Sequence, residues 1–103
     1  MTMKDCCREY LFGQFGDEEI VAEIYNEYVS SLGQKIAECD KALATGDWIA
    51  LDRAAHAMKG NALASGDEAV ANVAIALRND AKLQKAEEAQ ALVAKIKELQ
   101  ALL

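Results

Sequence analysis

The 103-residue sequence contains no proline and only six glycines. Strong helix formers, chiefly Ala, Leu, Glu, Lys and Gln, dominate in their place, and the alternating pattern typical of strands is almost absent. We therefore predict an all-α fold. A chain of this length can bury a modest core of its own, so we expect one domain over residues 1–103.

Two further absences exclude classes of function. The chain has 11 basic against 17 acidic residues, a net charge of −6, and no basic run, so we expect no nucleic-acid binding. Lysines 82, 85, 95 and 97 lie among acids and predict solvated helix faces. No apolar run approaches the roughly 20 residues of a membrane helix, and no signal peptide opens the chain, so a cytoplasmic protein without membrane contact is expected.

Cysteine and histidine are too few for a metal centre. Cys6, Cys7 and Cys39 form an odd set without CxxC spacing, and His56 is the only histidine. A zinc site would need more thiols or a second imidazole, so we expect no metal. We predict reduced thiols, with Cys39 in the core and the other two near a lightly packed start.

Hydrophobic periodicity predicts a long helix in the first half of the chain. Apolar residues recur at spacings of three and four between Asp17, an acidic helix start, and the turn at Thr45-Gly46-Asp47. The expected inward stripe is Ile20, Ile24, Tyr28, Leu32, Ile36, Cys39 and Leu43. A weaker pattern in residues 1–16 predicts a short helix that folds back on the others.

Three more helices are expected after that turn. Asp47 would cap a helix over 48–65, Ser65-Gly66-Asp67 would end it and cap the next, and that helix would loosen around Asn79-Asp80. The last helix would run from about residue 86 to the end. Short loops join antiparallel neighbours, so we predict an up-down antiparallel four-helix bundle with a short N-terminal capping helix.

The segment around His56 carries the strongest functional signal. At about 100° per residue, Lys59 lies roughly 60° to one side of His56 and Gly60 roughly 40° to the other. The apolar residues that would face the core lie more than roughly 90° away on the same helix. These are Leu51, Ala55, Met58 and Ala62. His56, Lys59 and Gly60 therefore point outward together.

This combination predicts a phosphate acceptor. A helical glycine costs about 1 kcal/mol relative to alanine, so Gly60 in an alanine-rich chain calls for a reason, such as close approach of a bulky group to His56. Lys59 indicates that negative charge arrives beside the imidazole.

Other chemistry lacks parts. Ser30, Ser31 and Ser65 have no convincing histidine partner for a catalytic triad. Asp52 and His56 could share a metal at i, i+4, but two ligands make a weak site and Lys59 would repel a cation. The chain also lacks a glycine-rich nucleotide-binding loop.

The residues His56-Ala-Met-Lys59-Gly60, followed by Gly66, resemble the H-x-[L/M]-K-G-x(5)-G signature of histidine-containing phosphotransfer (HPt) domains. The resemblance extends to the helix pattern from about residue 8 to the end. The chain departs from the family at Asn61, Ser65 and Asp67, which lie at the helix end and not at the expected phosphate site.

The resemblance implies a phosphocarrier and not an enzyme in its own right. His56 would accept and donate the phosphoryl group, Lys59 would offset its charge, and Gly60 would leave room for the partner. The implied partners are response-regulator receiver domains, and possible partners include a hybrid sensor kinase. The receiver would bring the aspartate and Mg²⁺, so no cofactor is expected here.

The expected docking surface surrounds His56. The predicted contact residues of this surface are Ile49, Asp52, Arg53 and Leu63. A monomer is the simpler expectation. The alternative that remains is a non-catalytic helical interaction module, which docks receiver domains without exchanging phosphate.

Overall fold

Helices make up nearly all of the structure. The computed structural model describes residues 3–103 and has no strand within them. Its five helices are α1 (Asp5–Phe15), α2 (Glu18–Thr45), α3 (Trp48–Ala64), α4 (Glu68–Lys82) and α5 (Ala86–Gln100). The predicted all-α class is confirmed. Within the described part of the chain, no helix is both long and apolar enough to cross a membrane.

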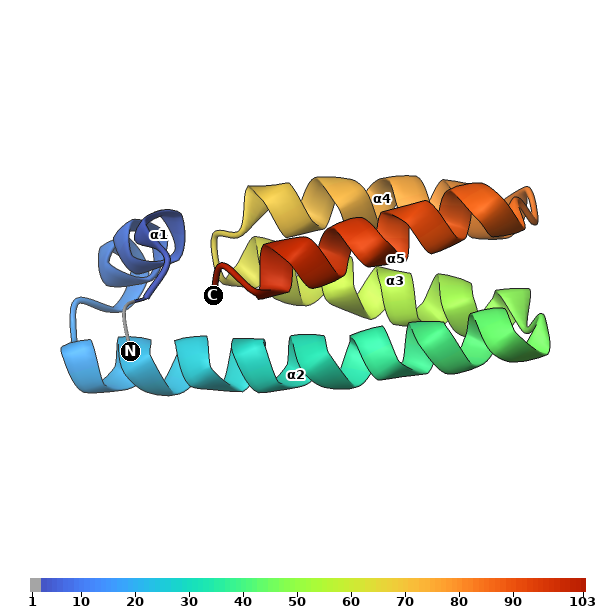
Figure 1. The fold of residues 1–103 in the computed structure, drawn as a ribbon. Coiled ribbons are helices and arrows are strands. Elements are labelled where there is room, and N and C mark those ends of the chain that lie inside the picture. Colours follow the sequence, from blue (N-terminus) through green and yellow to red (C-terminus); the bar gives the residue numbers. More distant parts are fainter. Residues whose placement is uncertain (1–2) are drawn as a thin grey trace.

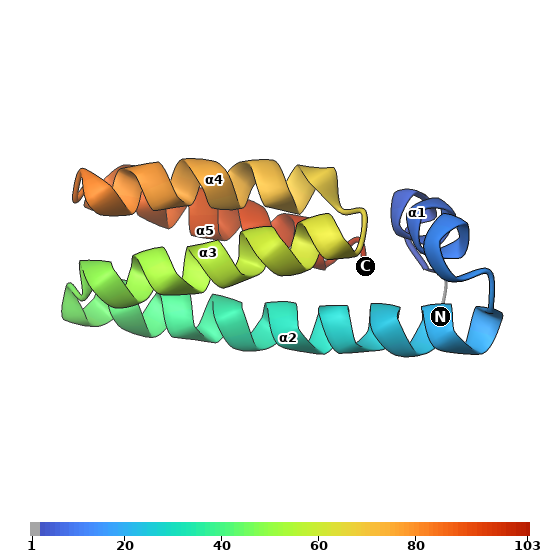
Figure 2. The same cartoon turned by 180° about the vertical axis from the view of Figure 1, so that it is seen from behind.

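Helices α2 to α5 lie alongside one another and enclose a common core. Helix α3 packs against α2 and α4, and α5 also packs against α2 and α4, so the contacts form a closed ring (Figure 1). Helix α1 packs against the first turns of α2, at the end of the bundle where the C-terminus also lies (Figure 2).

Three aspartates start the helices as the sequence predicts. The side chain of Asp17 accepts hydrogen bonds from the amides of Glu19 and Ile20, and that of Asp47 accepts one from the amide of Ala50 at 3.0 Å. The Asp67 carboxylate does the same at the start of α4. Each satisfies a backbone N–H that has no partner within its helix.

The main core consists of the inward faces of α2 to α5. Leu51, Ala55, Met58 and Ala62 of α3 are buried there, and Cys39 of α2 is fully buried, as predicted. Burial raises the pKa of the Cys39 thiol to about 12, and the negative charges of Asp40 and Glu38 act in the same direction. This thiol therefore stays protonated and unreactive at neutral pH.

A second, smaller core lies between α1 and α2, and it corrects two predictions. Val21 and Tyr25 are buried on α2, whereas the predicted Ile20 is 43% exposed and Ile24 is only partly covered. Cys7 is fully buried and not lightly packed. On α2, Val21 and Tyr25 continue the three- and four-residue spacing of the buried Tyr28 and so lie on the same face of the helix. Helix α1 covers that face beyond the ends of α3 and α5 (Figures 1 and 2), and Ile20 and Ile24 lie to one side of it.

Helix α4 also runs further than predicted. It continues through Asn79 and Asp80 to Lys82, and the amide of Leu83 still donates to the carbonyl of Asn79 at 3.1 Å. Ala81 near its end is buried against the core. Packing at this last turn therefore outweighs the low helix propensity of the Asn-Asp pair.

The buried carboxylate of Asp67 joins three parts of the chain. It accepts a hydrogen bond from the Tyr28 hydroxyl at 2.8 Å, lies 2.8 Å from the Lys4 ammonium, and caps α4 through the Val70 amide. Burial and the bond to Asp67 raise the pKa of Tyr28. Burial lowers the pKa of Lys4, but the hydrogen bond and charge of Asp67 outweigh that effect and raise it.

Candidate functional site

The functional residues predicted from the sequence lie together on the outer face of α3. His56 and Gly60 are exposed, and Lys59 is half-buried one turn beyond the histidine. The opposite face of the same helix packs into the core. The imidazole is therefore open to a second molecule, while its helix is fixed by the packing behind it.

Gly60 has no packing role within the described residues. A Cβ built at this position would meet no atom within 4 Å, so this chain has room for a side chain there. By contrast, a Cβ on Gly33 in α2 would come within 3.3 Å of the Gln100 side chain. The absence of a side chain at Gly60 leaves free space next to His56 for a group from outside.

Two exposed aliphatic side chains lie on the same face of α3, on either side of the histidine. Ile49, near the start of the helix, is 68% exposed, and Leu63, near its end, is 49% exposed. Both were predicted docking residues. Exposed apolar side chains placed around a functional group are typical of a transient interface.

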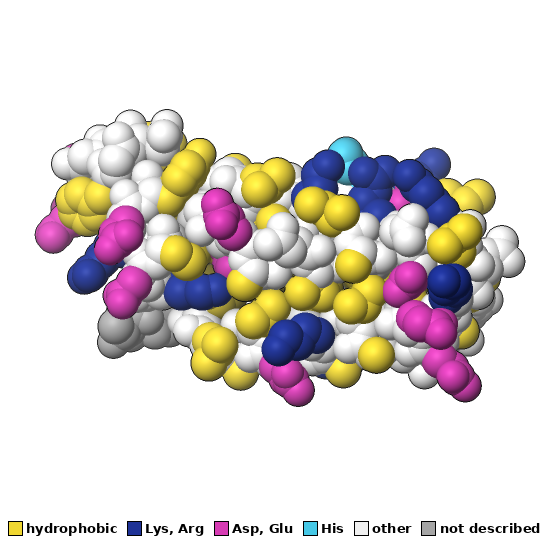
Figure 3. Space-filling view, turned by 90° about the horizontal axis from the view of Figure 1, so that it is seen from above, with side chains coloured by type: hydrophobic (Ala, Val, Ile, Leu, Met, Phe, Trp, Pro, Cys, Tyr) yellow, Lys and Arg dark blue, Asp and Glu magenta, His cyan; other side chains and the backbone are white. Residues whose placement is uncertain are grey.

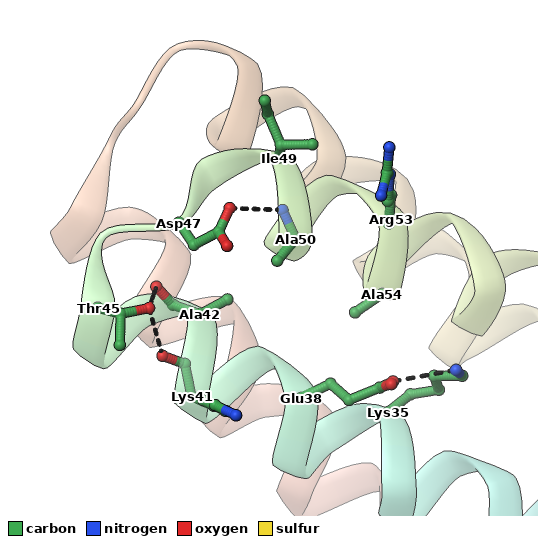
Figure 4. Close-up of a pocket in the computed structure, with 10 residues that line it drawn as sticks. All are labelled: Lys35, Glu38, Lys41, Ala42, Thr45, Asp47, Ile49, Ala50, Arg53 and Ala54. Carbon is green, nitrogen blue, oxygen red and sulfur yellow. Dashed lines mark hydrogen bonds and ion pairs between the residues drawn. The ribbon is translucent and has the colours of Figure 1, made fainter.

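A groove beside Ile49 separates α3 from α2. It has a volume of about 410 Å³. Its lining residues are Lys35, Glu38, Lys41, Ala42, Thr45, Asp47, Ile49, Ala50, Arg53 and Ala54. Figure 4 shows Ile49 and Arg53 at the rim, where they point away from α2, while Lys35 pairs with Glu38 at 3.0 Å on the far wall. Arg53, another predicted docking residue, is thus exposed beside the groove.

Asp52 has a partner that the sequence did not predict. Its carboxylate accepts a hydrogen bond from the Nε of Arg78 in α4 at 3.0 Å, and both side chains are partly buried. This carboxylate is therefore engaged within the chain, on the side of α3 that faces α4.

Among residues 3–103, no cluster of three or more His, Cys, Asp or Glu side chains could hold a metal.

The α4 side of the site is basic. Lys59, Arg78 and Lys82 line a hollow of about 220 Å³ between α3 and α4, together with Ile75 and Asn79. Figure 3 shows Lys and Arg side chains gathered around the only histidine, although the whole chain is acidic. Lys82, which the sequence assigned to a solvated face among acids, thus belongs to a local basic cluster.

Only weak signals in the sequence pointed to this cluster. Asp52 and Arg78 carry opposite charges on consecutive, antiparallel helices, and pairing them requires the register of α3 against α4. That register follows from core packing and not from the pattern of either helix alone.

Chemically, the site combines an accessible nucleophile with positive charge. A neutral imidazole nitrogen offers a lone pair to an electrophile near pH 7, and nearby cations favour an anionic group on it. Since His56 is exposed and not enclosed in a cavity, the reacting group would be presented by another molecule.

Comparison with known proteins agrees with this geometry. A family model described as the Hpt domain matches residues 23–103, a range that includes His56, Lys59, Gly60 and Gly66. Searches among curated proteins and among solved structures found no match. With the family model covering most of the chain and an exposed histidine on a helical bundle, the chain belongs to the Hpt domain family, the histidine-phosphotransfer modules of two-component signalling.

Proposed function

We propose that His56 carries a phosphoryl group between receiver-domain aspartates in a multistep two-component phosphorelay. The observation that carries this proposal is the outward placement of His56 on α3, with Lys59 one turn away and open space at Gly60. Family membership supports the class of reaction.

The transfer forms one bond to phosphorus and breaks another. A ring nitrogen of neutral His56 attacks the phosphorus of an aspartyl phosphate; the P–O bond to the partner's aspartate breaks as the new P–N bond forms, and the imidazole releases its proton to water. The reverse step passes the group to a second aspartate. Positioning and charge neutralisation supply most of the catalysis in such transfers.

Each residue of the motif has a separate task in this step. Lys59 offsets the negative charge of the phosphoryl group on the ring. Gly60 lets the loops around the partner's aspartate approach the helix closely. Ile49, Arg53 and Leu63 provide the surrounding contact surface, and Asp52 contributes through its ion pair with Arg78.

The wider proposal is a phosphocarrier that needs a partner for its chemistry. It has no cofactor of its own, and the receiver supplies Mg²⁺ at its aspartate. Its proposed partners in the cytoplasm are receiver domains and a hybrid sensor kinase. The closed ring of contacts supports an up-down antiparallel bundle of α2 to α5 capped by α1. In this proposal the chain acts as one domain over residues 1–103 and as a monomer.

Incubation with a receiver phosphorylated on its aspartate tests the proposal. The wild-type chain should gain a label that is stable in alkali and labile in acid, as expected for a phosphohistidine. His56→Gln should abolish it while leaving the helical circular dichroism unchanged, because the side chain lies outside the core. Label retained by His56→Gln would disprove the assignment.

The same experiment separates the alternative. A module that only docks receivers would bind the phosphorylated receiver equally well with His56→Ala and would gain no label in either form. Binding without label would therefore replace the phosphocarrier with the docking module.

A further inference from the structure

The distribution of charge around His56 is opposite to that of the whole chain. The net charge is −6, yet Lys59, Arg78 and Lys82 line one hollow next to the histidine face of α3. Only Lys59 belongs to the helix of the histidine and to its sequence motif. The other two come from α4, so the positive charge extends across the hollow between α3 and α4.

Arg78 is held in place by a specific contact. Its Nε donates to Asp52 at 3.0 Å, and Asp52 lies one helical turn before His56 on the same face of α3. An arginine bound through Nε keeps both terminal nitrogens free to donate to a second anion. Asp52 thus ties the guanidinium to the helix that carries the histidine.

The basic residues of α4 are not all neutralised by neighbouring acids. Among the described residues, Asp52 is the one ion-pair partner of Arg78, and no ion pair involves Lys59 or Lys82. The hollow therefore carries surplus positive charge. Partial burial of Arg78, with 26% of its side chain exposed, weakens solvent screening of that charge.

We propose that Arg78, positioned by Asp52 and assisted by Lys82, forms a second charge-neutralising wall for the phosphoryl group on His56, facing Lys59 across the α3–α4 groove. This inference rests on the proposed function and adds a helix to the site. Arg78 and Lys82 stabilise the phosphorylated form, and Asp52 serves as the positioning residue for Arg78.

Phosphoramidate provides a test that needs no partner protein. It can transfer its phosphoryl group to a histidine. The P–N bond to its amino group breaks, a P–N bond to the imidazole forms, and the amino group takes up the ring proton and leaves as ammonia. The rate of labelling is followed by ³¹P NMR. A pH titration of the bound phosphoryl group then reports the charge around it, which a purely structural role of Arg78 would not change.

The decisive variant is Arg78→Gln, and Lys95→Gln is its control. Lys95 is an exposed lysine of α5 that pairs only loosely with Glu98 at 3.7 Å, so its loss changes the net charge equally at a distant site. Arg78→Gln should slow labelling roughly threefold to tenfold and raise the titration midpoint of the phosphoryl group by about half a pH unit. Lys95→Gln should change neither.

Two further variants separate charge from packing. Arg78→Lys keeps the charge but has a single nitrogen for both Asp52 and the phosphoryl group, so it should restore part of the midpoint; a midpoint equal to that of Arg78→Gln would overturn the proposal. If Arg78→Gln proves unfolded by circular dichroism, Lys82→Gln takes its place, because Lys82 lines the same hollow and is exposed. It should also raise the titration midpoint of the phosphoryl group, and an unchanged midpoint would overturn the proposal.

The outcomes distinguish this inference from the proposed function. Equal rates and midpoints in Arg78→Gln and Lys95→Gln would overturn the second wall and leave the phosphocarrier intact. No phosphohistidine on the wild-type chain, from phosphoramidate or from a phosphorylated receiver, would overturn the proposed function and this inference with it.

Discussion

Replacing Gly60 by alanine should make the protein more stable and its phosphotransfer slower. Gly60 lies inside α3, is exposed, and has no atom within 4 Å of the place its Cβ would occupy. An alanine there meets no clash in this chain and gains about 1 kcal/mol of helix propensity. For a domain of this size, that gain corresponds to a rise in Tm of roughly 4–8 °C.

The same methyl group should obstruct the partner. If the partner's loops approach the backbone at Gly60, an added methyl at their contact costs about 1–3 kcal/mol, as overpacking does in a protein core. We therefore expect transfer from a phosphorylated receiver to slow about tenfold. Urea denaturation measures the first effect, and rapid-quench transfer kinetics measure the second.

Gly33→Ala is the matched control. It lies inside α2, where a Cβ would meet only the flexible end of Gln100 at 3.3 Å, so it should also gain helix stability. It faces α5 and should transfer at the wild-type rate. A Gly60→Ala variant that is stabilised but transfers normally would refute the clearance argument, and one that is destabilised would refute the geometry at Gly60.

Three other outcomes are expected. Asp67→Ala should destabilise the fold by about 3 kcal/mol in urea denaturation, because the cap of α4 is lost and the Tyr28 hydroxyl is left buried without a partner; a change below about 1 kcal/mol would contradict this. Burial raises the pKa of Cys39 from 9.0 to about 12, so the unfolded thiol ionises first and stability should fall as pH rises above about 9, by at most about 1.4 kcal/mol per unit. The urea midpoint should fall less steeply with rising alkaline pH in Cys39→Ala than in the wild type. An equal slope in both would show that Cys39 does not cause this pH dependence. Ile49→Ser and Leu63→Ser should leave stability within about 0.5 kcal/mol but weaken receiver binding in calorimetry, whereas unchanged affinity would remove both from the docking surface.

The sequence was most informative where the cause is local. The caps at Asp17, Asp47 and Asp67 depend on a side chain and the amides two or three residues later, and all three were predicted. The outward face of α3 follows from the phase of one helix. The arrangement of His56 relative to the core could therefore be read without coordinates, although its chemical role stays a prediction.

What could not be predicted depends on which helix covers which face. The burial of Val21, Tyr25 and Cys7 follows from where α1 packs on α2. The contribution of Arg78 to the site follows from the register between α3 and α4. Such pairings are decided by the packing of the whole core, and no single stretch of sequence contains them.

The ion pair between Lys4 and Asp67 affects where the chain can be shortened. The family match begins at residue 23, but the counterion of the fully buried Asp67 lies nineteen positions earlier. A fragment cut to the matched region would retain a carboxylate desolvated against Tyr28 with no cation beside it. We therefore expect a fragment that begins at residue 23 to be less stable than the whole chain, because Asp67 would lose the charge of Lys4 and the small core between α1 and α2 would lose its cover.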